Sequence, residues 1–184
     1  LMDDYTVTRS PRSYNSQIGV PLSVWGLWAQ SQIGIFEAAI SQPGEMEALE
    51  AIIQPTIGVF TCLGSAHQEN FESMEQKCTE KLQLFRDAQT LIYPADDPIV
   101  SKCVEQMDFR GKLIPWHRTG KGAMEDNKEI CRAVCRHLGM SEEVINERVA
   151  RLEPVAMRLE VKSGRNGCTL INDSYNSDLG SLDI

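Results

Sequence analysis

Short apolar runs alternate with amphipathic stretches along most of this 184-residue chain, and this alternation constrains the fold more than any other feature. We expect strands at 5–10, 32–40, 56–63, 90–93 and 112–116. We expect helices between them at 21–30, 44–53, 73–88 and 98–107. Continuous apolar strands joined by helices are typical of a parallel sheet covered by helices on both faces. The predicted fold class is therefore α/β.

The pattern changes after Trp116, where a polar stretch containing glycine interrupts the alternation. Two helices are expected next, at about 125–138 and 141–151. The stretch "AMRLEVKSGRNGCTLINDS" then predicts two strands around an Asn166-Gly167 hairpin turn. Pro154 is the predicted boundary between a first domain, 1–153, and the beginning of a second, 154–184. The final "SDLGSLDI" reads as the start of a helix cut short, so we expect a piece of a longer protein.

Composition excludes several classes of function. Lysine and arginine number 18 against 26 aspartates and glutamates, a net charge of −8, which argues against a nucleic-acid or membrane-surface binder. No apolar run approaches the roughly 20 residues of a membrane span, and the first residues lack the features of a signal peptide. The six cysteines form no C-x-x-C pair and are interpreted as reduced residues of a cytoplasmic protein.

Two polar residues lie near the carboxyl ends of neighbouring predicted strands, where open α/β sheets bind their ligands. Glu37 shares a strand face with Ile33 and Ile35, so its carboxylate must either be paired, bind a metal, or reach water where the strand ends. His67 follows the strand 56–63 on a loop of small residues. A lone loop histidine is more often solvated or hydrogen-bonded than a ligand, and the pattern alone leaves this open.

Lys81 interrupts an apolar stripe on the helix expected at 73–88. The other members of the stripe are Met74, Cys78, Phe85 and Ala88. The polar residues Glu75, Lys77, Glu80 and Arg86 are expected largely on the opposite side. Lys81 can extend its ammonium to solvent from the edge of the stripe. Alternatively, carbamylation by CO₂ would convert it into an oxygen ligand for a hard cation such as Mg²⁺.

Four stretches resemble the Mur ligases, the ATP-dependent amide-forming enzymes of peptidoglycan synthesis. They are "SYNSQIGVP" (13–21), "FEAAISQPGEM" (36–46), "SAHQENFESMEQKCTEKLQLF" (65–85) and "INDSYNSDLGS" (171–181). They follow the family order, and they are most similar to the member that adds D-alanyl-D-alanine to UDP-muramoyl-tripeptide. The stretches "RSPRSYNSQIGVPLSVW" and "RLEPVAMRLEV" resemble the version of this ligase that some bacteria fuse to an alanine racemase.

The resemblance implies a role for seven residues. Glu37 and His67 would bind Mg²⁺, and Lys81 would be carbamylated beside the metal. Asn15 would lie near the metal and the substrate carboxylate. Asn127, expected to open a helix, would contact adenine, although it would otherwise be interpreted as an ordinary capping residue. Arg158 would reach nucleotide phosphate, and would otherwise be a solvated strand charge. Asp173 would contact the nucleotide across the interdomain cleft, and would otherwise be a turn residue after a strand.

The implied reaction passes through an acyl phosphate. The substrate carboxylate attacks the γ-phosphate of ATP, and the amine of D-alanyl-D-alanine then displaces phosphate to form the amide. Because two anions must meet, divalent cations and cationic donors are needed. The implied cofactors are ATP and Mg²⁺; pyridoxal phosphate would belong only to a fused racemase domain.

The chain departs from the family pattern at its phosphate-binding loop. No G-x-x-x-x-G-K-[ST] occurs, and "TGKGA" (119–123) does not supply it. We therefore expect a fragment that is inactive alone. The alternative is a non-catalytic scaffold with the same fold; a folate polyglutamylating ligase is disfavoured by "NDSYNSD". A sheet lacking its usual first strand could also pair with a second chain.

Overall fold

The computed structural model describes residues 1–153, 160–172 and 174 of the chain. The strands before the hairpin are β1 (Val7–Arg9), β2 (Ile33–Ile35), β3 (Ile57–Val59), β4 (Thr90–Pro94) and β5 (Lys112–Trp116). The helices are α1 (Gly19–Val24), α2 (Glu45–Ile53), α3 (Met74–Gln83), α4 (Pro98–Gln106), α5 (Ala123–His137) and α6 (Glu142–Ala150). The predicted alternation is confirmed, although β1, β2 and β3 are much shorter than the apolar runs that contain them. The predicted boundary at Pro154 lies outside the described residues.

All strand pairs before residue 117 are parallel, as the alternation predicts, but they form two ladders rather than one. β1 pairs with β2, and β3, β4 and β5 form a second ladder in that order. β2 ends at Ile35 because Phe36 turns back over Gly34: a Cβ built on that glycine would lie 2.8 Å from the Phe36 ring. The predicted run 32–40 therefore leaves the ladder before it reaches Glu37.

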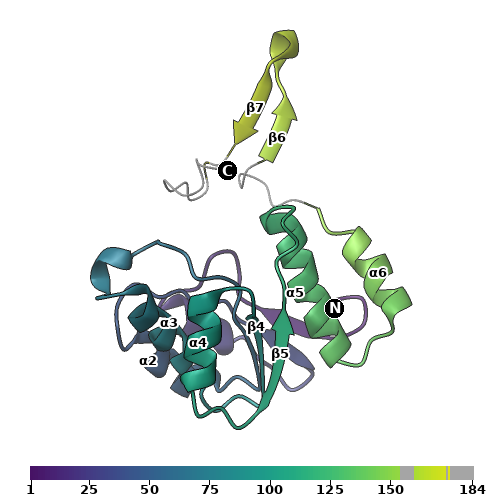
Figure 1. Cartoon of the computed structure of the whole chain (residues 1–184). Coiled ribbons are helices and arrows are strands. Elements are labelled where there is room, and N and C mark those ends of the chain that lie inside the picture. Colours follow the sequence, from purple (N-terminus) through teal and green to yellow (C-terminus); the bar gives the residue numbers. More distant parts are fainter. Residues whose placement is uncertain (154–159, 173, 175–184) are drawn as a thin grey trace.

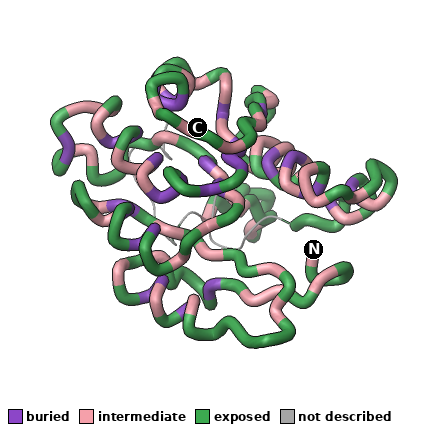
Figure 2. The backbone as a smooth tube through the Cα atoms, turned by 90° about the horizontal axis from the view of Figure 1, so that it is seen from below, coloured by how far each residue is buried: buried purple, intermediate pink, exposed green. Residues whose placement is uncertain are grey.

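Helices cover both faces of the β3–β4–β5 ladder. Leu91 and Ile92 are adjacent on β4 and fully buried, yet they belong to different apolar clusters, because successive side chains of a strand point to opposite faces. Leu91 packs with residues of α2, α3 and α4, whereas Ile92 packs with Trp116 and with Ile130 of α5. Figure 1 shows α4 and α5 on opposite sides of β4 and β5. Buried and exposed residues alternate along the helices in Figure 2, as this arrangement requires.

The predicted hairpin is confirmed. β6 (Glu160–Ser163) pairs antiparallel with β7 (Thr169–Asn172), with Glu160 opposite Asn172. Asn166 and Gly167 both have positive φ, 57° and 75°, which is the backbone geometry that an Asn-Gly turn favours.

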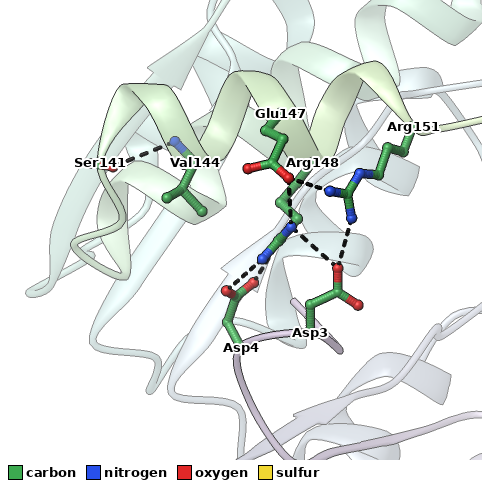
Figure 3. Close-up of polar contacts among 7 residues, drawn as sticks. All are labelled: Asp3, Asp4, Ser141, Val144, Glu147, Arg148 and Arg151. Carbon is green, nitrogen blue, oxygen red and sulfur yellow. Dashed lines mark hydrogen bonds and ion pairs between the residues drawn. The ribbon is translucent and has the colours of Figure 1, made fainter.

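Two arginines, Arg148 in the last turn of α6 and Arg151 just after the helix, bind the N-terminal segment through a cluster of ion pairs (Figure 3). The guanidinium of Arg148 donates to both carboxylate oxygens of Asp4, each at 3.2 Å, and Arg151 donates to Asp3 at 3.2 Å. The hydrogen bond from Arg148 is the main reason that the pKa of Asp4 lies below its usual value. Leu1 packs beside the buried Ile145 and Val149 of α6, so apolar and ionic contacts hold the segment before β1.

Among the described residues, no helix has both the length and the apolar character that are needed to span a membrane.

Gly58 in the middle of β3 is required by the ring of Phe85. A Cβ added at this glycine would lie 2.5 Å from Phe85 Cδ1. We expect Gly58→Ala to lower the free energy of unfolding by about 1–3 kcal/mol through overpacking, measured by urea denaturation. Gly64→Ala is the matched control, because nothing lies within 4 Å of a Cβ there. Equal stability of the two variants would contradict the packing described.

The ion pair between Asp4 and Arg148 predicts a pH-dependent contribution to stability. Because the folded-state pKa of Asp4 is lowered, its contribution is present above the ordinary pKa of 3.8 and is lost as pH falls through the folded-state value. Asp4→Asn should therefore lower the melting temperature at pH 7, and the difference should disappear in acid and shrink in high salt. Asp108→Asn removes a carboxylate whose side chain is 92% exposed, and it should change little at any pH. A difference for Asp4→Asn that persists in acid would exclude an ionic origin.

Candidate functional site

Asn15 and Glu37 are in direct contact, although 22 positions separate them in the sequence. Asn15 Nδ2 donates to Glu37 Oε1 at 3.1 Å. The two loops are also joined by their backbones, because the Ala39 amide donates to the Asn15 carbonyl at 2.9 Å. Glu37 is exposed and follows the end of β2 by two residues, so water can reach its carboxylate. It forms no ion pair with any residue that the structure describes, which leaves the carboxylate free to bind a cation.

His67 lies in a left-handed backbone conformation, with φ 59° and ψ 21°, immediately before a short 3-10 helix at Gln68–Asn70. It is exposed, and it lines a pocket of about 340 Å³ together with Asn15, Gln17 and Glu45. Within the described ranges, the imidazole makes no hydrogen bond, so both ring nitrogens are accessible. The strand end thus presents the histidine next to the Asn15–Glu37 pair.

Two further polar groups of this pocket were not singled out by the sequence. Glu45, the first residue of α2, accepts hydrogen bonds from the Ser41 and Gln42 amides at 2.6 and 3.0 Å. Burial opposes ionisation of Glu45, but these bonds and nearby His67 outweigh it, and the pKa of Glu45 is lowered. The side-chain nitrogen of Gln17 is buried without a hydrogen-bond partner, and so is the side-chain oxygen of Gln68. Unpaired buried polar atoms are costly, and a bound water or ligand is one way in which they are satisfied.

Lys81 is half-buried on the side of α3 that faces the end of β3. Its Nζ donates to the carbonyl oxygen of Cys62 at 3.0 Å and lies 5.4 Å from the centroid of the Phe60 ring. Loss of hydration on burial lowers the pKa of Lys81. Of the two readings that the sequence left open for Lys81, the contacts with Cys62 and Phe60 favour the one in which its ammonium does not simply extend to solvent.

Lys77 was expected on the polar side of the helix, and this prediction is wrong. The residue is only 2% exposed, and its Nζ donates to the Gly64 carbonyl at 2.7 Å and also to the Ala66 carbonyl. Positions 77 and 81 are one turn apart on the same face of α3, and the loop 61–66 crosses that face. The buried face of α3 is therefore wider than its stripe of apolar residues. It includes two lysines, because the carbonyls of the crossing loop accept hydrogen bonds from them.

The structure brings these residues together in pairs. Asn15 contacts Glu37 directly, Asn15 and His67 line one pocket, and Lys81 contacts the end of the strand that leads to His67. Among residues 1–153, 160–172 and 174, no three His, Cys, Asp or Glu side chains are grouped to hold a metal ion. A divalent cation bound by Glu37 and His67 would therefore need a third donor of another kind.

Asn127 lies inside α5, not at its beginning, so the prediction that it opens the helix is wrong. The helix begins at Ala123, after Gly122 with φ 103°. The earlier start has a local cause: Asp126 Oδ1 accepts from both the amide and the hydroxyl of Thr119, at 2.7 and 2.8 Å, which folds the preceding loop onto the first turn. Asn127 is exposed near the carboxyl end of β5 and is not a capping residue. Arg158 and Asp173 lie outside the described residues.

Comparisons with known proteins all point to one protein family. The Mur ligase middle domain family matches residues 2–127. UDP-N-acetylmuramoyl-tripeptide–D-alanyl-D-alanine ligase of Bacillus subtilis (strain 168) is 24% identical over 212 residues, and the match covers 99% of this chain and 46% of that protein. The ligase of the same name from Treponema pallidum (strain Nichols) is 33% identical over 81 residues, covering 44% of this chain and 18% of that one.

Two solved structures share the fold. MurF from Acinetobacter baumannii superposes with a TM-score of 0.88 at 18% identity, covering 100% of this chain and 48% of that one. MurF ligase from Thermotoga maritima in complex with ADP gives a TM-score of 0.82 at 21% identity, covering 100% of this chain and 50% of that one. The α/β fold class is confirmed. The chain spans about half the length of the first of these relatives.

The buried position of Lys81 predicts an unusual titration. Its Nζ should titrate below the 10.5 of an ordinary lysine, followed by side-chain ¹⁵N NMR, with Lys81→Met identifying the resonance. Because the folded-state pKa is lowered, burial of the charge destabilises the fold below that value, and stability should rise as pH increases from it towards 10.5. Titration at 10.5 or above would show that the amine is solvated and would contradict the position described.

Proposed function

Because the chain belongs to the Mur ligase middle domain family, we propose that it is the central part of an ATP-dependent ligase that adds D-alanyl-D-alanine to UDP-N-acetylmuramoyl-tripeptide. The relatives that span nearly all of the chain carry that name. One observation supports the proposal most directly: Asn15, Glu37 and His67 gather beyond the carboxyl ends of β2 and β3, each of which belongs to a parallel ladder. Open α/β sheets bind their ligands at this edge.

The metal in this proposal is Mg²⁺, bound by Glu37 and His67 with Lys81 as third donor. The donors fit the role: the carboxylate has no ion-pair partner and the imidazole no hydrogen bond in the described part of the chain, and the lysine contacts the same strand end. Carbamylation of Lys81 would supply the missing oxygen. The neutral amine attacks the carbon of CO₂, an N–C bond forms, and one proton passes to water, so the lowered pKa favours the reaction. When bound, Mg²⁺ would neutralise charge between the reacting anions.

The residues of this chain would position the reactants of a two-step amide synthesis. A substrate carboxylate attacks the γ-phosphate of ATP and releases ADP; the incoming amine then attacks the acyl phosphate and releases phosphate. Asn15, already bonded to Glu37, would orient the substrate carboxylate near the metal. Asn127 would contact adenine from the exposed side of α5, while Arg158 and Asp173 would contribute from the second domain.

The domain organisation that accompanies this function is 1–153 as the ATP- and metal-binding domain and 154–184 as the beginning of the C-terminal domain. The substrates would be a UDP-muramoyl peptide and D-alanyl-D-alanine. Self-association through a sheet edge and fusion to an alanine racemase, the only source of a role for pyridoxal phosphate, stay predictions from the sequence.

Metal titration of three variants tests the proposal. Mn²⁺ or Mg²⁺ affinity, measured calorimetrically in bicarbonate buffer, should fall at least about 10-fold in Glu37→Gln, His67→Gln and Lys81→Met. Glu105→Gln, an exposed carboxylate on α4, is the control and should bind as the wild type does. With ¹³C-bicarbonate, a carbamate resonance should appear and be absent from Lys81→Met.

A chain that binds no divalent cation, or binds it equally well in all four variants, would contradict the proposed site. The non-catalytic scaffold would then be the better assignment.

A further inference from the structure

Three alternate carbonyl groups after β3 point towards α3. These are the carbonyls of Cys62, Gly64 and Ala66, and each accepts a hydrogen bond from a lysine ammonium. Lys81 serves the first of them, at 3.0 Å, and Lys77 serves the other two. Two lysines one turn apart on α3 thus hold three carbonyls of the loop against the helix.

Lys77 forms no ion pair with the residues that the structure describes, although the carboxylate of Glu69 attracts its charge from a longer distance. Its polar contacts are the carbonyls of Gly64 and Ala66, and its Nζ lies 5.7 Å from the centroid of the Phe71 ring. The residue is 2% exposed, and its neighbour Cys78 is fully buried. An apolar side chain would avoid the free-energy cost of burying an ammonium, but it would remove the hydrogen-bond donors of the Gly64 and Ala66 carbonyls. The lysine is thus explained by its hydrogen bonds and not by an ion pair.

The bond to Ala66 acts directly on His67. The carbonyl of Ala66 and the amide of His67 belong to one planar peptide unit, so a donor that fixes the first also fixes the second. His67 has a positive φ of 59°, a conformation uncommon for residues other than glycine, and such conformations persist where surrounding contacts hold them. Residues 61–65 lie in no helix or strand, so side-chain contacts must hold them.

We propose that Lys77 is a positioning residue that aims the imidazole of His67 into the site. It acts through the Ala66–His67 peptide and touches neither substrate nor metal. The proposal rests on the proposed function, because aiming the imidazole matters only if His67 binds a ligand there.

The same hydrogen bonds explain why carbamylation is expected at Lys81 and not at Lys77. A carbamate on Lys77 would place an anion against two carbonyl oxygens and remove donors from both. Lys81 donates to a single carbonyl and is less buried than Lys77, so its modification disrupts less. Lys77 is therefore expected to stay an unmodified ammonium with a structural role, whereas the amine of Lys81 can be modified.

Three variants of the full chain test the role of Lys77. Lys77→Met keeps the side-chain length but removes the N–H donors, Lys77→Arg keeps charged donors, and Lys102→Met alters an exposed lysine of α4 as the control. In Lys77→Met we expect amide hydrogen exchange at 64–68 to be at least about 10-fold faster and the ring resonances of His67 to shift. Mn²⁺ affinity should fall about 10-fold. Lys77→Arg should restore part of each effect, and Lys102→Met should show none.

A purely structural role would lower the melting temperature of Lys77→Met without changing the His67 resonances or the Mn²⁺ affinity of the folded protein, and that result would overturn the proposal. If Lys77→Met does not fold, Lys77→Gln decides the question, because its shorter neutral amide cannot serve both carbonyls as the ammonium does. Unchanged loop exchange and unchanged His67 resonances in that variant would overturn the proposal equally. If the wild type binds no Mn²⁺, the proposed metal site fails. The positioning role is still judged by exchange and ring resonances, which need no metal.

Discussion

The hydrogen bonds between two lysines of α3 and the loop after β3 are the interaction on which the candidate site depends. Beyond the end of β3, the carbonyls of the loop have no neighbouring strand to donate hydrogen bonds to them. Lys77 and Lys81 supply them to Cys62, Gly64 and Ala66. Because these bonds fix the backbone up to Ala66, His67 leaves the strand end in a defined direction. Without them, the histidine would be attached to six residues of irregular chain.

Parallel strand geometry explains why the remaining groups lie near the histidine. Glu37 follows the carboxyl end of β2 and His67 follows that of β3, and each strand belongs to a parallel ladder. Open α/β sheets bind their ligands beyond such strand ends. Asn15 joins them, contacting Glu37 at 3.1 Å and sharing a pocket with His67. The fold, which also occurs in MurF ligases, thus gathers oxygen and nitrogen donors from loops that are far apart in the sequence.

Much of this arrangement could be predicted from periodicity, and the rest depends on contacts that the sequence does not encode locally. Apolar runs located the strands, and Asn166-Gly167 located the hairpin, because both are local preferences. The burial of Lys77 could not be read from the helix, because it depends on a loop that crosses α3 from outside the helix. The early start of α5 depends on a bond between Thr119 and Asp126, and the Asn15–Glu37 contact joins loops 22 positions apart. An amphipathic pattern shows which side of a helix is apolar, but it does not show which side is covered by other parts of the chain.

A crystal structure of the protein grown with Mn²⁺ and bicarbonate, with anomalous scattering recorded for the metal, tests the central claim most directly. The account predicts one anomalous peak shared by the Glu37 carboxylate and the His67 imidazole, with carbamate density on Lys81 and an unmodified ammonium on Lys77. Separate ions at the two side chains, no peak between them, or a carbamate on Lys77 would contradict it.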